Sequence, residues 1–146
     1  MNIVKELQEI RDKHKDQRVI VVGTTCTGKS TLLKKIQNAQ DMDDLIFPLL
    51  SEEEKAYVCS KVWTEEIGRT MTRLVKERVK VEKGKPVFGT VVLDADLIVF
   101  LDIDDDLLKE RCTKRKTSFE NAKNIQKQII QEIKMSKIPS ITLREG

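Results

Sequence analysis

Residues 19–30 read Val19-Ile20-Val21-Val22-Gly23-Thr24-Thr25-Cys26-Thr27-Gly28-Lys29-Ser30. The apolar run at the start is typical of a parallel strand that helices cover on both faces. The rest has the pattern Gly-x-x-x-x-Gly-Lys-Ser, and the segment that follows, residues 31–36, favours a helix. A strand, this loop and a helix in direct succession are the setting in which the pattern predicts a loop that binds phosphate groups.

The chemistry of such a loop depends on its backbone and on two side chains. Glycines let the chain wrap closely around phosphate oxygens, while the loop N–H groups and the N-terminus of the next helix point at the anion. Lys29 supplies positive charge for the β- and γ-phosphates, and the Ser30 hydroxyl is a predicted ligand of Mg²⁺. We therefore expect a nucleotide to be bound by Gly23, Thr24, Thr25, Cys26, Thr27, Gly28, Lys29, Ser30 and Thr31.

Length and composition narrow the possible classes of protein. The chain has 146 residues, which suits one domain with its own core. Its 27 basic and 24 acidic residues are interspersed, so a net charge of +3 gives no reason to expect nucleic acid as a partner. We find no apolar run long enough to cross a membrane and no signal-peptide pattern. Three cysteines without metal-like spacing predict free thiols in a reducing compartment, hence a cytoplasmic protein.

The order of apolar and helical segments predicts an α/β fold with three layers. Residues 1–16 are expected to form an amphipathic helix that packs against the sheet edge, and residues 18–143 the core. Strands are predicted at 18–22, 86–90, 97–103 and 139–143, with a very short one ending at the acidic residues 41–44. Helices are predicted at 29–38, from 51 to about 81 with a break near Ser60, after Asp104, and at 119–136. These strands predict a parallel sheet of about five strands. We expect Trp63 to lie in the core rather than at a ligand.

The acidic residues after the loop helix are the first candidates for chemistry beyond phosphate binding. Asp41 and Asp43 would stand at the carboxyl edge of the sheet, where ligands bind in open α/β folds. One carboxylate there could hold Mg²⁺, and the other could accept a proton from an attacking hydroxyl. The alternatives are helix capping and a solvated turn. Asp94, which follows the apolar run 91–93, is a second candidate to support Mg²⁺.

Arginines form the second group of candidates. Arg111 and Arg115 are four residues apart on a predicted helix, so they can converge on one ligand and offset charge on a transferring phosphate. Arg69 and Arg73 could bind an acidic group of a second substrate. For both pairs the alternative is a solvated basic face.

These segments together resemble the small P-loop kinases of the shikimate, adenylate and nucleoside kinase group. The resemblance covers about residues 18–143 and rests on the loop 23–30, the segment 41–43, the segment 65–69, the strand 97–103 and the lid-like segment 107–115. It implies the P-loop NTPase fold and Mg²⁺-dependent transfer of a phosphoryl group from ATP.

The resemblance also implies roles for individual residues. Lys29 and Ser30 match the residues for phosphate and Mg²⁺. Asp41 and Asp43 match an Asp-x-Asp pair in which one acid serves the metal and the other the acceptor hydroxyl, and we assign Asp41 to the metal and Asp43 to the acceptor. The remaining matches are the lid arginines, Arg111 and Arg115, and the acceptor-side arginines, Arg69 and Arg73.

We therefore expect a monomeric or homodimeric kinase that phosphorylates the hydroxyl or phosphate of a nucleoside, nucleotide or shikimate-like metabolite. Lys29, Asp43, Arg111 and Arg115 are the expected catalytic residues, and the absence of an Asn/Thr-Lys-x-Asp signature favours ATP over GTP. The rival interpretation is a regulatory or interaction protein that binds a nucleotide and hydrolyses it slowly. A kinase of nucleic-acid ends is a third, which rests on the many lysines.

Overall fold

A five-stranded parallel sheet forms the centre of the structure. The structure is a computed structural model, and it describes residues 3–59 and 64–145. The strands are β1 (Val19–Val22), β2 (Gln40–Asp41), β3 (Val87–Gly89), β4 (Leu97–Ile103) and β5 (Ser140–Glu145). Their order across the sheet is β2-β3-β1-β4-β5, and every neighbouring pair is parallel. The predicted α/β class and the number of strands are thereby confirmed.

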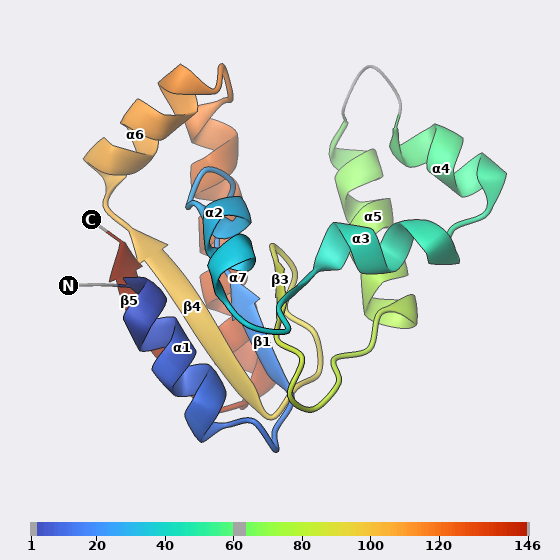
Figure 1. Cartoon of the computed structure of the whole chain (residues 1–146). Coiled ribbons are helices and arrows are strands. Elements are labelled where there is room, and N and C mark those ends of the chain that lie inside the picture. The colour runs from blue at the N-terminus through green and yellow to red at the C-terminus, as the bar shows by residue number, and fades with distance from the viewer. Residues whose placement is uncertain (1–2, 60–63, 146) are drawn as a thin grey trace.

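Helices cover both faces of the sheet (Figure 1). On one face, α1 (Ile3–Lys13) and α2 (Lys29–Lys35) pack on β1, β4 and β5 through a cluster that includes Leu7, Leu32 and Val99. On the other, α3 (Met42–Ile46), α5 (Glu65–Arg78) and α7 (Phe119–Ser136) pack through a larger cluster. The result is a three-layer arrangement in which β1 and β4 are almost entirely buried. None of the described helices is long and apolar enough to span a membrane.

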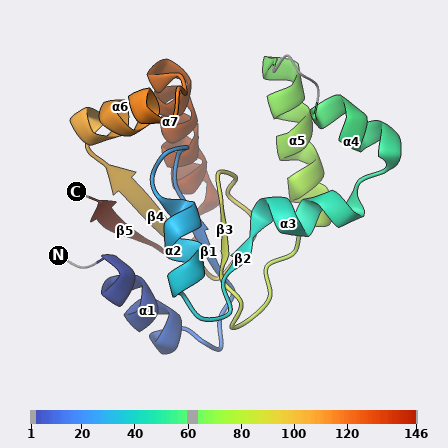
Figure 2. The same cartoon turned by 45° about the horizontal axis from the view of Figure 1, so that its top comes forward.

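The strand order places the loop after β1 at a branch point of the sheet. After β1 the chain forms β2 and β3 on one side of it and then β4 and β5 on the other. The strand order therefore reverses direction at β1, and ligands of open α/β sheets bind in the crevice at the carboxyl end of such a strand. Helix α6 (Asp105–Lys114) lies at the same end of the sheet as this loop, as both views show (Figures 1 and 2). Its Leu108 and Cys112 pack with Cys26 of the loop and Ala122 of α7.

Most element boundaries agree with the sequence prediction, and two regions differ in detail. The short strand before the acidic residues is β2, and it leads directly into α3 and the 3-10 turn Phe47–Leu49, neither of which was predicted. The long helical region from residue 51 divides into α4 (Glu52–Val58) and α5. The expected break near Ser60 and the core assignment of Trp63 lie outside the described residues.

Helices α3, α4 and α5 form an arm beyond the β2 edge of the sheet (Figure 2), and one ion pair joins α4 to α5. Ser51 and Glu54 form the predicted capping box at the start of α4. Glu54 also accepts two hydrogen bonds from Arg78 at the end of α5, at 2.6 and 2.8 Å. This bidentate contact lowers the pKa of Glu54 to about 2.

The change Glu54→Gln tests this contact because it keeps an acceptor for the capping box and removes the charge. The folded-state pKa of Glu54 is depressed, so its stabilisation is present above the ordinary value of 4.5 and disappears as the pH falls towards 2. We expect the variant to unfold at lower urea concentration than the wild type at pH 7, and the difference to shrink between pH 4.5 and 2. A difference that does not change with pH would show that the charge contributes nothing.

Candidate functional site

The Lys29 side chain lies inside the loop that follows β1. Its Nζ donates to the carbonyl oxygens of Gly23 at 2.7 Å and Thr24 at 2.6 Å, and to Thr27 Oγ1 at 3.3 Å. The loop closes at Gly28, whose φ of 87° is in the left-handed region that favours glycine. The Lys29 amine is thus held within the loop by two backbone carbonyl oxygens and one hydroxyl.

The surroundings of this amine are electrostatically mixed. The pKa of Lys29 is lowered from 10.5 to about 8, mainly by burial and to a small extent by Arg115, whereas Cys26, Asp41 and Asp43 act to raise it. The two acids and the arginine therefore lie near enough to Lys29 to affect its charge. These three residues come from β2, α3 and the end of α6, so three separate segments converge on the loop.

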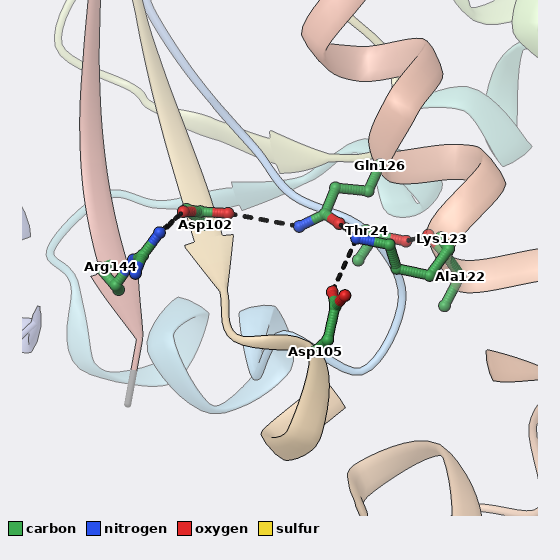
Figure 3. Close-up of polar contacts among 7 residues, drawn as sticks. All are labelled: Thr24, Asp102, Asp105, Ala122, Lys123, Gln126 and Arg144. Atoms are coloured by element: carbon green, nitrogen blue, oxygen red, sulfur yellow. Dashed lines mark hydrogen bonds and ion pairs between the residues drawn. The ribbon is translucent and has the colours of Figure 1, made fainter. Parts of the chain in front are cut away.

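Two buried threonines attach the loop to the rest of the fold. Thr24 is fully buried, and its hydroxyl donates to the carbonyl oxygen of Ala122 in α7 (Figure 3). Thr27 is also buried, and its hydroxyl donates to the carbonyl oxygen of Thr24 at 2.8 Å. Thr24 and Thr27 thus use their hydroxyl groups within the protein, and the Thr24 carbonyl oxygen also accepts from Lys29. Among the described residues, Thr25 has a buried hydroxyl without a hydrogen-bond partner, which fits contact with a polar ligand.

A polar network behind the loop was not predicted from the sequence. Gln126 of α7 is buried and donates to Asp102 at the end of β4, which also accepts from Arg144 of β5 at 2.8 Å (Figure 3). Lys123 joins Gln126 Oε1 and Asp105 of α6, each at 2.7 Å. The network holds α7, which carries the anchor for Thr24, against the sheet and α6. The available signal in the sequence was Gln126 itself, a polar residue in the buried stripe of α7 four positions after Ala122.

On one flank of the loop, β2 and α3 present the acidic pair. Asp41 is the N-cap of α3, where its Oδ1 accepts from the backbone N–H of Asp43 at 3.0 Å. The capping alternative therefore describes the Asp41 side chain correctly, and the same residue still lies near Lys29. Partial burial raises the pKa of Asp43, and the charges of Asp41 and Asp44 raise it further. A carboxylate with a raised pKa is suited to accept a proton.

A glycine in β3 sets the position of these acids. Gly89 lies under Met42, so a Cβ added at residue 89 would come within 2.6 Å of Met42 Cε and Sδ and 2.8 Å of its Cβ. The same glycine accepts a backbone hydrogen bond from Gly23 at 3.2 Å. Because the chain has no side chain here, α3 can start directly above β3, next to the loop.

On the opposite flank, α6 presents the basic pair. Arg111 donates to the carbonyl oxygen of Cys26 in the loop at 3.5 Å, and Arg115 ends the helix near Lys29. Both arginines line an open groove with Gly28 and Ser30. The structure thus brings Arg111 and Arg115 to the loop.

Three predicted residues are not brought to the loop by the contacts that the structure shows. Asp94 pairs with Arg18 at 3.1 Å, and Arg18 precedes β1, so Asp94 lies at the opposite end of the sheet. The prediction that Asp94 supports Mg²⁺ at the loop is therefore wrong. Arg69 and Arg73 are on the arm, and they pair along α5 with Glu65 at 3.8 Å and Glu77 at 3.5 Å.

The residues at the loop are compatible with a magnesium ion. Mg²⁺ prefers oxygen ligands and in nucleotide sites keeps several waters, with one or two protein ligands and the phosphates completing its shell. The exposed Ser30 hydroxyl and the Asp41 carboxylate are oxygen donors of this kind near Lys29. No group of three or more His, Cys, Asp or Glu side chains suited to a metal occurs in the part of the chain that the structure describes. An ion here would need the phosphates of a ligand.

Comparisons with known proteins add no family to this geometry. No protein-family model matches the chain, and no curated protein matches it either. The functional argument therefore depends on the residues and their arrangement.

The Lys29 ammonium gives a direct test of the loop geometry. In the free protein its resonances should titrate with a pKa of about 8, because burial disfavours the charged form. The unfolded chain then binds more protons between pH 8 and 10.5, so the free energy of unfolding should rise with pH across this interval. Carbon-detected NMR of the lysine side chains measures the titration, and Lys29→Met identifies the resonance by its loss. A lysine that titrates at its ordinary pH would contradict the buried geometry.

Gly89→Ala tests the close approach of α3 to β3. The added methyl group must displace Met42, and overpacking of this kind typically costs about 1–3 kcal/mol of the free energy of unfolding. The cost should be smaller in a Met42→Ala background, where two of the three close atoms are gone. Urea unfolding of the four proteins of this double-mutant cycle measures the coupling. Purely additive changes would show that the two residues do not crowd each other.

Proposed function

We propose that this protein is a small-molecule kinase that transfers the γ-phosphoryl group of ATP to a hydroxyl or phosphate of its acceptor. The observation that carries this proposal is the convergence on the loop that holds Lys29 of carboxylates from one flank and arginines from the other. This arrangement suits transfer between two substrates, because an acid can engage the acceptor while the arginines balance the charge of the moving phosphate.

Each residue has a role that its position supports. Lys29 and the backbone N–H groups of residues 23–31 hold the phosphates of ATP. Arg115, which is close enough to lower the pKa of Lys29, and Arg111, which contacts the loop, offset charge on the transferring group. Asp43 accepts the proton of the acceptor hydroxyl or anchors that hydroxyl, consistent with its raised pKa.

Mg²⁺ would be held by Ser30 and by Asp41, directly or through water, together with the phosphates. When bound, it neutralises part of the phosphate charge. Arg69 and Arg73 stay candidates for the acceptor side through their position on the arm, where α5 packs against α3.

The change Asp43→Asn tests the assignment of the acid, with Asp44→Asn as the matched control. Both residues lie in the first turn of α3, and both changes remove one negative charge. Acceptor-stimulated release of ADP should fall by about 10²–10⁴-fold in Asp43→Asn, the usual effect of losing a general base. ATP binding should survive in this variant, and the control should keep its turnover.

Other outcomes of this experiment have a clear meaning. If Asp43→Asn and Asp44→Asn behave alike, Asp43 has no special part in transfer. If no acceptor stimulates turnover in the wild type although ATP binds, the regulatory interpretation with slow hydrolysis replaces the kinase.

A further inference from the structure

The groove beside the loop extends away from the acidic pair and reaches the first turn of α1. Its volume is about 540 Å³, within the range of small-molecule sites. At one end it shares Gly28 and Ser30 with the loop. At the other it is lined by Ile3 and Val4. Helix α1 runs antiparallel to β1, so its N-terminus lies at the carboxyl end of the sheet, where the loop also lies (Figure 1).

The walls of the groove differ in chemistry from the opposite flank of the loop. Four basic side chains line it, and no acidic side chain is among the described residues that do so: Lys35, Arg111, Lys114 and Arg115. Ile3 and Val4 are partly buried and pack on the cluster beneath α1, so their apolar surface is held in place. The groove therefore combines an apolar wall with cationic groups and hydroxyls, whereas the other flank carries Asp41 and Asp43.

We infer that the first turn of α1 forms one wall of the site for the base of the nucleotide, an inference that rests on the proposed function. With the phosphates at the loop, the nucleoside can extend along the groove, which begins at the same loop. The opposite flank is needed for Mg²⁺ and the acceptor, to which Asp41 and Asp43 are assigned. The groove attracts the phosphates and offers Ile3 and Val4 as an apolar surface for a planar ring.

Arg111 provides the complementary wall. A guanidinium group is planar and stacks on aromatic rings as well as attracting phosphates. The described side chains of the groove include hydroxyls but neither carboxylates nor carboxamides, the groups that read the edges of a base. We therefore expect a site that binds purine bases by contact and stacking and discriminates ATP from GTP by less than about tenfold, since strong selection needs dedicated hydrogen bonds.

Methyl NMR of the full chain tests this inference without any substitution. Mg²⁺–ATP should shift the methyl resonances of Ile3 and Val4 through the ring current of the base, and Mg²⁺–tripolyphosphate, which lacks a base, should leave them unchanged. Ile10, on the same helix and outside the groove, should respond to neither ligand. Equal responses of Ile3 and Val4 to both ligands, or no response to either, would overturn the inference.

Substitutions give the corresponding affinities. The double change Ile3→Ser and Val4→Ser should weaken ATP binding roughly tenfold and leave tripolyphosphate binding unchanged, because only apolar contact with the nucleoside is lost. Ile10→Ser is the matched control and should change neither affinity. A parallel loss for both ligands would show that α1 merely supports the loop.

The two ligands also separate failure of this inference from failure of the proposed function. A wild-type protein that binds tripolyphosphate and ATP equally tightly has a working phosphate loop and no base site, which overturns the inference alone. A wild-type protein that binds neither ligand overturns both.

Discussion

The ammonium group of Lys29 is the constraint on which the functional end of the structure depends. A buried charge is costly unless polar groups surround it, and here the carbonyl oxygens of Gly23 and Thr24 meet it at 2.7 and 2.6 Å. To turn those carbonyls inward, the loop must curl back on itself and close at Gly28 with a positive φ. The curled loop in turn needs an external anchor, which the Thr24 hydroxyl finds on α7.

The strand order of the sheet then determines which segments surround the amine of Lys29. Because β3 and β4 lie on either side of β1, the chain reaches the loop from two directions. From the β2 side come Asp41 and Asp43, placed close to the loop because Gly89 leaves room for Met42. From the β4 side comes α6, which packs on the loop through Cys26, Leu108 and Cys112. Acids on one flank and arginines on the other follow from topology as much as from local sequence.

The parts of the fold that the sequence predicted are those with strong local signals. The strand at 19–22 is a continuous apolar run, and the strand at 97–103 is apolar except for Asp102. Helices α4 and α7 begin at the caps that Ser51 and Ser118 provide. The helix α3 was missed because it has only five residues, too few to show a period. The role of Gln126 was missed because one of its partners, Asp102, lies on a strand 24 positions earlier in the sequence.

The candidate site shows the same division between local and distant effects. The residues of the loop could be singled out from the sequence because their pattern is contiguous. Asp94 was misplaced because an apolar run followed by an acid also describes a buried connector: Val91, Val92 and Leu93 pack in the core without forming a strand, and Arg18 holds the acid at the far end of the sheet. The approach of α1 to the loop depends on how the helix crosses the sheet, which no periodicity reveals.

Phosphorus NMR of ATP turnover tests the central claim most directly. The full chain is incubated with Mg²⁺–ATP and, one at a time, nucleosides, nucleoside monophosphates, sugars and shikimate-like acids, with Lys29→Ala in parallel. The account predicts that one class of acceptor gives a new phosphorylated product as the γ-phosphate resonance of ATP declines, and that Lys29→Ala gives none. If inorganic phosphate is the only product with every acceptor, the site does not transfer phosphoryl groups to such acceptors, and the account is contradicted.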